Sequence, residues 1–180
     1  MAITFVIVLP LGAVLMRVAR FKGAVWVHAA WQLMGWALMI AGLGIGVRLG
    51  KIIDYVSSPA CLHSNTHTIL GIIIVVLMLI QPFIGFIHHY LFRRKQIQTA
   101  ATHLHIWYGR LLILLGIING GLGLALAGNT MAGTIAYGVV AGAIGVAYLS
   151  LVGGFEWRKV KRSVEVIPSS EREESTQQTA

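Results

Sequence analysis

Histidine is the residue type most able to do chemistry in this sequence, because seven histidines occur in a chain that is 57% hydrophobic. An ionisable group within a lipid bilayer is costly and marks a functional site by default. His28 and His105 lie early in two long apolar stretches. Two neutral imidazoles facing each other across a helical bundle are suitable axial ligands for a six-coordinate b-type haem iron. The pair therefore predicts a haem between helices, and two interfacial histidines are the alternative that spacing alone leaves open.

A glycine follows two of the histidines at the same distance. Gly71 lies four residues after His67, and Gly109 lies four residues after His105. One helical turn separates each pair, so a glycine there removes the side chain that would collide with a porphyrin lying beside the helix. Helix packing is the competing explanation for both glycines.

Arg110 lies next to Gly109 within an apolar stretch. An arginine inside a membrane needs an anionic partner or a route to the interface, and no Asp or Glu occurs within any of the apolar stretches. A haem propionate is therefore one expected partner. Snorkelling of the side chain to the membrane surface is the other interpretation.

The remaining histidines are expected at the membrane surface, and they are His63, His88, His89 and His103. His88 and His89 lie just before the basic run from Arg93 to Lys95. A basic rim of this kind attracts small anions through its local field. Binding of a small anionic reductant there is one hypothesis that the sequence allows.

Five apolar stretches must position these residues, and each is long or nearly long enough to cross a bilayer as a helix. Only 11% of the residues are charged, against roughly 25% in a typical soluble domain. We therefore expect an all-α integral membrane bundle of about five transmembrane helices, with one domain over residues 1–157 and a disordered cytoplasmic tail over residues 158–180. The stretches are Met1–Met16, Ala24–Val47, Thr66–Tyr90, His103–Ala127 and Met131–Phe155.

Basic residues cluster after the first, third and fifth apolar stretches, and the other loops carry few of them. The positive-inside rule therefore predicts an outside N-terminus and an inside C-terminus. Under this topology His28 and His105 lie at similar depth near the inner face, and His67 lies near the outer face. The first stretch has its charges on its C-terminal flank, which argues against a cleaved signal peptide. Its 16 residues would span only about 24 Å of a hydrocarbon core about 30 Å thick.

Several function classes are disfavoured by composition. The net charge of +8 is explained by the topological clusters, so we expect no nucleic-acid partner. Cys61 is the only cysteine, which excludes an intrachain disulfide and a Cys-x-x-Cys-His haem attachment. Membrane carriers of metals or protons commonly use intramembrane carboxylates, which this chain lacks. A histidine-lined transporter and a haem-free structural membrane protein are the alternatives to a haem protein.

Five segments together resemble the cytochrome b561 family, in the version that follows an extracellular DOMON domain in fungal proteins. They are Val25–Gln32, His67–Gly71, Gln81–His89, His105–Arg110 and Ile118–Gly121. In that family four histidines on four successive helices hold two b-type haems, one near each membrane face. The resemblance implies electron transport from cytosolic ascorbate to an outside acceptor, as in a ferric reductase of the plasma membrane or an endomembrane. Ferric iron, monodehydroascorbate or a DOMON haem partner would be the acceptor.

The resemblance implies haem-iron ligation by His28, His67 and His105. It implies no ligand role for the other four histidines, which are expected at the interface or next to the ligands. Contacts of Gly71, Gly109 and Arg110 with haem are expected from their positions in the sequence. We expect no catalytic acid, base or nucleophile. The chain departs from the family at its start. The family's first core helix opens with a His-Gly pair near the outer face, and residues Met1–Phe5 of this chain contain neither a histidine nor a glycine. A truncated gene model and a genuine short form both fit this start. We expect one haem at the inner site and an outer haem that is absent, weakly bound or five-coordinate.

Overall fold

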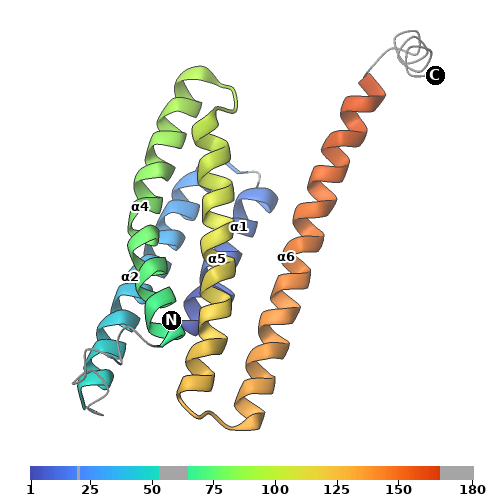
Figure 1. The fold of residues 1–180 in the computed structure, drawn as a ribbon. Helices are drawn as coiled ribbons and strands as arrows, with labels where there is room; N and C mark the ends of the chain where they lie inside the picture. The colour runs from blue at the N-terminus through green and yellow to red at the C-terminus, as the bar shows by residue number, and fades with distance from the viewer. Residues whose placement is uncertain (20, 53–64, 167–180) are drawn as a thin grey trace, which may run out of the picture.

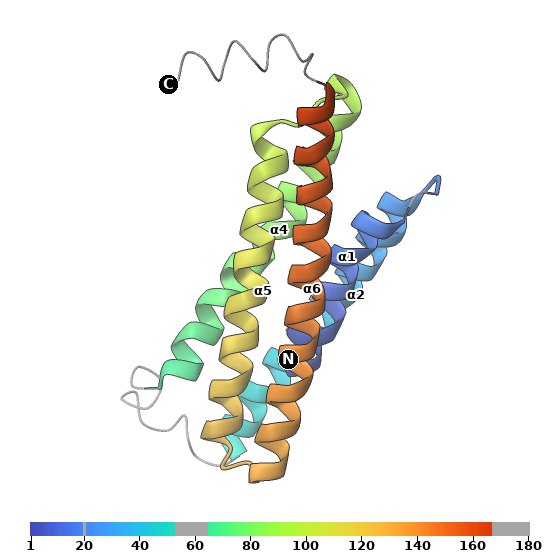
Figure 2. The same ribbon diagram turned by 90° about the vertical axis from the view of Figure 1, so that its right-hand side faces the viewer.

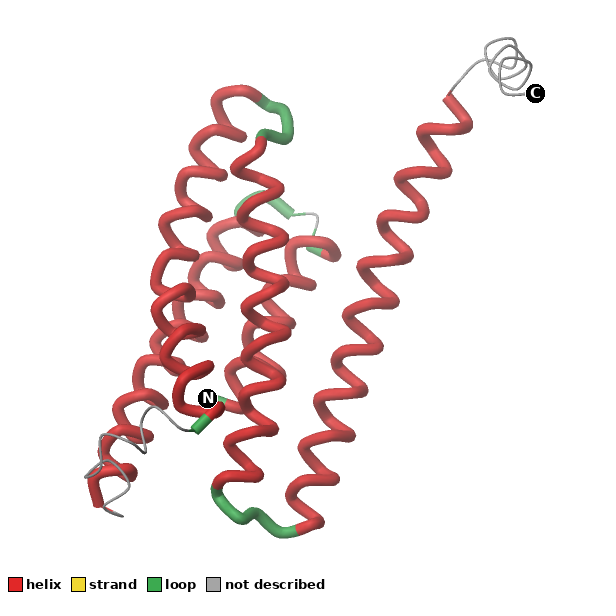
Figure 3. Tube along the Cα trace, viewed as in Figure 1, coloured by secondary structure: helices red, strands yellow, loops and turns green. Residues whose placement is uncertain are grey.

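The computed structural model describes residues 1–19, 21–52 and 65–166, and helices make up nearly all of them (Figure 3). No strand occurs in these ranges. The elements are the π-helix η1 (Thr4–Val8) and the α-helices α1 (Leu9–Val18), α2 (Ala24–Ile52), α4 (Thr66–Lys95), α5 (Ala100–Leu126) and α6 (Met131–Val166). The predicted all-α membrane bundle is thereby confirmed.

Four helices of the described chain are long and apolar enough to cross a membrane, namely α2, α4, α5 and the segment Met131–Phe155 of α6. One further apolar helix, Thr4–Val18, consists of η1 and α1 and is referred to as the first helix. It is shorter than the other four, in agreement with the length deficit of the first apolar stretch. Helix α6 continues to Val166, past the domain boundary predicted at residue 157. The rest of the predicted tail, residues 167–180, lies outside the described residues, as does His63.

Helices α4 and α5 form an antiparallel hairpin that packs along most of its length. The first helix and α2 pack against one side of this hairpin, and α6 runs alongside α5 (Figures 1 and 2). The loop between α4 and α5 and the C-terminal end of α6 lie at the same end of the molecule, opposite the loop between α5 and α6 (Figure 1). The basic ends of α4 and α6 thus share one side, as the topology prediction requires, and the orientation in a membrane stays a prediction.

The core lies where the first helix, α2, α4 and α5 meet. Met39, Ile74 and Leu112 are fully buried there. Most other large apolar side chains point outward, and Phe83 and Phe86 of α4 are 69% and 74% exposed. An apolar outer surface of this kind is suited to contact with lipid chains.

Side chains of α2 hold the first helix through its backbone. Trp31 Nε1 donates to the carbonyl oxygen of Val8 at 2.7 Å, and Gln32 Nε2 donates to that of Leu9 at 3.2 Å. A Cβ atom at Gly12 would lie 2.7 Å from Trp31 Cδ1, so the glycine allows the close approach. The side chains of Trp31 and Gln32 thus find partners in the bundle without charged residues.

We predict that Gly116→Ala destabilises the bundle. A Cβ at Gly116 would overlap the ring of Phe5 in the first helix, and overpacking of this kind typically costs about 1–3 kcal/mol. Gly138→Ala in α6 is the matched control, because a Cβ there has no neighbour within 4 Å. Thermal unfolding in detergent measures both variants. Equal melting temperatures for the two would contradict the packing described here.

Candidate functional site

Histidines from three helices lie near one another at the end of the bundle where α4 joins α5. They are His28 on α2, His88 on α4 and His105 on α5. The rings of His88 and His105 stack with their centroids 5.6 Å apart and their planes inclined by 15°. His28 and His105 lie at the same end of the bundle, and their common depth in a membrane stays a prediction. His88, which was expected at the membrane surface or next to the ligands, is in contact with His105.

His28 is oriented by the first helix. Its Nδ1 donates to the carbonyl oxygen of Gly12 at 2.7 Å. A neutral imidazole that donates through Nδ1 keeps Nε2 unprotonated, which is the form that ligates a metal. Together with the bonds of Trp31 and Gln32 to the same helix, this contact gives the segment Val25–Gln32 a physical role. The His-x-x-Trp-Gln pattern fastens α2 to the first helix.

His105 lies in a slot on the surface of α4. A Cβ atom at Gly85 would lie 2.9 Å from His105 Cε1, so only glycine leaves room for the ring. Nδ1 of His105 is buried without a hydrogen-bond partner, and the same is true of Nδ1 of His88. Buried polar atoms without partners are uncommon and call for an explanation. Imidazole nitrogens that are left free in this way fit the donor set of a haem-iron site.

His67 occupies the opposite end of the hairpin. Asn65 caps helix α4 there, accepting from the backbone N–H of His67 at 2.9 Å. The ring Nδ1 of His67 donates to the carbonyl oxygen of Asn119 at 2.9 Å, which again leaves Nε2 free. His67 therefore meets the same requirement for ligation as His28.

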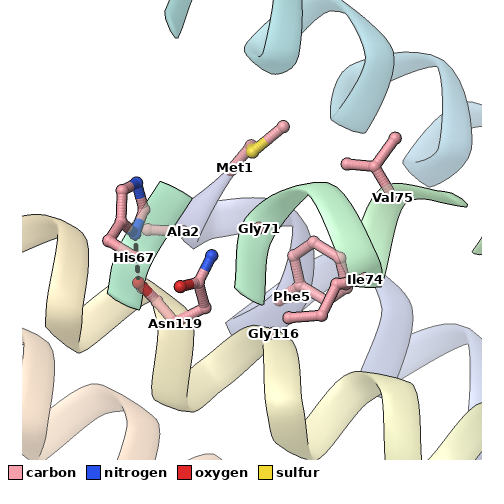
Figure 4. A pocket seen from close by; sticks show the side chains of 10 residues that line it. Met1, Ala2, Phe5, His67, Gly71, Ile74, Val75, Gly116 and Asn119 are labelled. Carbon is pink, nitrogen blue, oxygen red and sulfur yellow. Dashed lines mark hydrogen bonds between the residues drawn. The ribbon is translucent and has the colours of Figure 1, made fainter. Parts of the chain in front are cut away.

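A small cavity adjoins His67 (Figure 4). Its volume is about 30 Å³, and Met1, Phe5 and Asn119 are among the residues that line it. This space is on the scale of one or two water molecules. A porphyrin beside His67 would therefore need the first helix or its side chains to move.

The two glycines predicted to lie beside a porphyrin have other neighbours here. A Cβ at Gly71 would lie 3.0 Å from Asn119 Nδ2, and one at Gly109 would lie 2.6 Å from Gln81 Nε2. Each glycine thus accommodates a carboxamide of the facing helix. This arrangement gives the glycines a packing role, and their contact with haem stays a prediction.

Arg110 and His89 each lie against an aromatic ring. The guanidinium carbon of Arg110 lies 4.7 Å from the ring centroid of Trp107, whose side chain is 64% exposed. The ring of His89 meets that of Trp26 edge-on, and His103 is exposed. Within the described ranges, no group of three or more His, Cys, Asp or Glu residues could hold a metal ion by itself.

Comparisons with known proteins found a matching family model and a relative. The family model for eukaryotic cytochrome b561 matches residues 1–128. A cytochrome b561 and DOMON domain-containing protein of Arabidopsis thaliana is 30% identical over 150 residues, which are 79% of this chain. The chain spans 34% of the length of that relative. No solved structure matches the chain.

Proposed function

The chain belongs to the eukaryotic cytochrome b561 family and is thus a multi-pass membrane protein of electron transport; we propose that ascorbate on the cytoplasmic side is its electron donor. The acceptor on the other side would be ferric iron, monodehydroascorbate or a haem-bearing DOMON partner. The DOMON domain in the name of the Arabidopsis relative supports the last of these. The observation that carries the proposal is the presence of histidine sites at both ends of the α4–α5 hairpin.

His28 and His105 are the proposed axial ligands of the inner haem. They come from different helices, and the Gly12 carbonyl orients one ring while the Gly85 slot receives the other. Haem b, when bound, supplies one-electron chemistry between ferrous and ferric iron. The chain's own part is to hold two neutral imidazoles in an apolar bundle that excludes water. No acid, base or nucleophile is needed for electron transfer alone.

The outer site is proposed to be incomplete. His67 offers one free Nε2, and among the described residues the first helix contributes no histidine opposite it. The basic ends of α4 and α6 favour the approach of an anionic donor such as ascorbate to the inner side. Family membership favours electron transport over the histidine-lined transporter and the haem-free structural protein.

His28→Ala and His105→Ala should each abolish the low-spin signal of the inner haem, because each removes one of two axial ligands. The measurement is the reduced-minus-oxidised spectrum of the purified protein, with ascorbate and dithionite compared as reductants. His103→Ala is the matched control, since this histidine lies two residues from His105 and is exposed. A full complement of six-coordinate haem in both ligand variants would refute the assignment.

Arg110→Gln tests the proposed contact with a haem propionate. Loss of the guanidinium should lower haem retention or shift the midpoint potential, because a charge-assisted hydrogen bond to a carboxylate is lost. Trp107→Phe is the control, as it keeps an aromatic ring beside Arg110. Unchanged haem content and potential in Arg110→Gln would favour contact with Trp107 and the interface instead.

For residues 1–180 alone, the haem-to-chain ratio should be close to one. The cavity beside His67 is small, and the helix Thr4–Val18 that lines it contains no histidine. Haem extraction and protein quantification give the ratio directly, and the ratio should rise toward two when an upstream His-Gly start is added to the first helix. Two low-spin haems per chain without that addition would be incompatible with an incomplete outer site.

A further inference from the structure

Helices α4 and α5 carry the same four-residue pattern at the same spacing. A histidine is followed by a glycine four residues later, by a carboxamide residue fourteen later and by a second glycine eighteen later. In α4 these residues are His67, Gly71, Gln81 and Gly85. In α5 they are His105, Gly109, Asn119 and Gly123. The two helices are antiparallel, so a repeat of this kind is inverted.

The contacts between the helices follow the repeat. The ring of His105 lies against Gly85, and that of His67 lies against Gly123, where a Cβ would be 2.7 Å from His67 Cε1. In both pairs the histidine that begins the pattern in one helix lies against the glycine that ends the pattern in the other helix. An approximate two-fold relation between the helices explains why both contacts exist.

The carboxamides obey the same relation. Asn119 Nδ2 faces Gly71, and Gln81 Nε2 faces Gly109. The carboxamide of the pattern in one helix thus lies against the first glycine of the pattern in the other helix. Ile74 and Leu112, each seven residues after its histidine, are 2% and 0% exposed. The relation thus extends from the two ends of the hairpin into its core.

Each carboxamide residue is bonded to the histidine residue at its own end. Gln81 Nε2 donates to the carbonyl oxygen of His105 at 2.9 Å, and the carbonyl oxygen of Asn119 accepts from the ring of His67 at 2.9 Å. The carboxamide oxygens, Gln81 Oε1 and Asn119 Oδ1, are buried without partners. The two oxygens occupy matching positions, so they follow the same two-fold relation.

We propose that Gln81 is a positioning residue of the His105 site through its side-chain amide, and that Asn119, at the matching position, holds His67 through its backbone carbonyl oxygen. Gln81 holds the His105 segment of α5 in register with the slot at Gly85, and Asn119 holds the ring of His67 against Gly123. Neither residue touches the reacting iron, so each acts through its histidine. The inference rests on the proposed function only where a haem is concerned, because the contacts themselves involve protein atoms alone.

The test deletes each carboxamide while nearly preserving side-chain shape, with Gln81→Met and Asn119→Leu. Nitrogen NMR of histidine-labelled full-length protein reports on each ring separately, with or without haem. Gln81→Met should change the signals of His105 and leave those of His67 unchanged. Asn119→Leu keeps the backbone carbonyl oxygen that accepts from His67, so it should leave the signals of both rings unchanged. Ile80→Val and Ile118→Val are the controls, since these residues precede the carboxamides and are 46% and 49% exposed.

Haem binding is the second measurement. Gln81→Met should lower the affinity of the inner haem by about ten-fold or more and alter its low-spin electron paramagnetic resonance signal, because groups that orient a metal ligand typically contribute that much. Asn119→Leu should leave the inner haem unchanged. If Gln81→Met does not fold, Gln81→Asn shortens the side chain by one methylene group and should again move only the His105 signals.

The outcomes separate the two proposals. In Gln81→Met, changes that spread equally over both rings, or signals that stay as in the wild type, would overturn the positioning role of Gln81. A change of the His67 signals in Asn119→Leu would contradict the role of Asn119 through its backbone. The predicted pattern of ring signals in a protein that binds no haem would uphold the positioning role and remove the proposed function.

Discussion

Close contact between a histidine ring and a glycine of the facing helix is the constraint on which the rest of the bundle depends. His67 lies against Gly123 and His105 against Gly85, at opposite ends of one hairpin. An imidazole is bulky, and two helices can enclose it only where one of them has no side chain. The helices must therefore keep a single register, and that register brings Gln81 opposite Gly109 and buries Ile74 and Leu112 in the core.

Backbone carbonyl oxygens serve as the polar partners that intramembrane carboxylates supply in other proteins. His28 and His67 both donate from Nδ1 to a carbonyl oxygen of another helix, at Gly12 and Asn119. A carbonyl that already accepts a helical hydrogen bond has a second lone pair, so the helix is not interrupted by this use. The arrangement fixes the tautomer of each ring without placing a charge in the apolar bundle. Tyr108 and Tyr137 use the same device, donating to the carbonyl oxygens of Leu77 and Ile117.

The two ends of the hairpin differ in what surrounds their histidines. At one end His105 meets His88 and lies near His28 from a third helix. At the other end His67 has a small cavity lined partly by Met1 and Phe5 of the first helix. Two sites that are related by symmetry within the hairpin are thus made unequal by the helices packed around it. This inequality is the physical basis for expecting unequal haem binding at the two faces.

The sequence by itself determined the helical class, the long spans and the deficit of the first helix, because hydrophobic length decides those features. It predicts a shared depth for His28 and His105 as well. It also contained the spacing from each histidine to its following glycine, but the neighbour of that glycine depends on the register between helices. Only the tertiary structure showed that Asn119 and Gln81 occupy those spaces and that His88 stacks on His105. Contacts between helices are set by rotation and translation about their axes, which a pattern along one helix leaves undetermined. The repeated spacing from each histidine to a carboxamide residue fourteen residues later and a glycine eighteen residues later was present in the sequence. Only the antiparallel pairing of the helices showed that each histidine lies against the last glycine of the other helix's pattern.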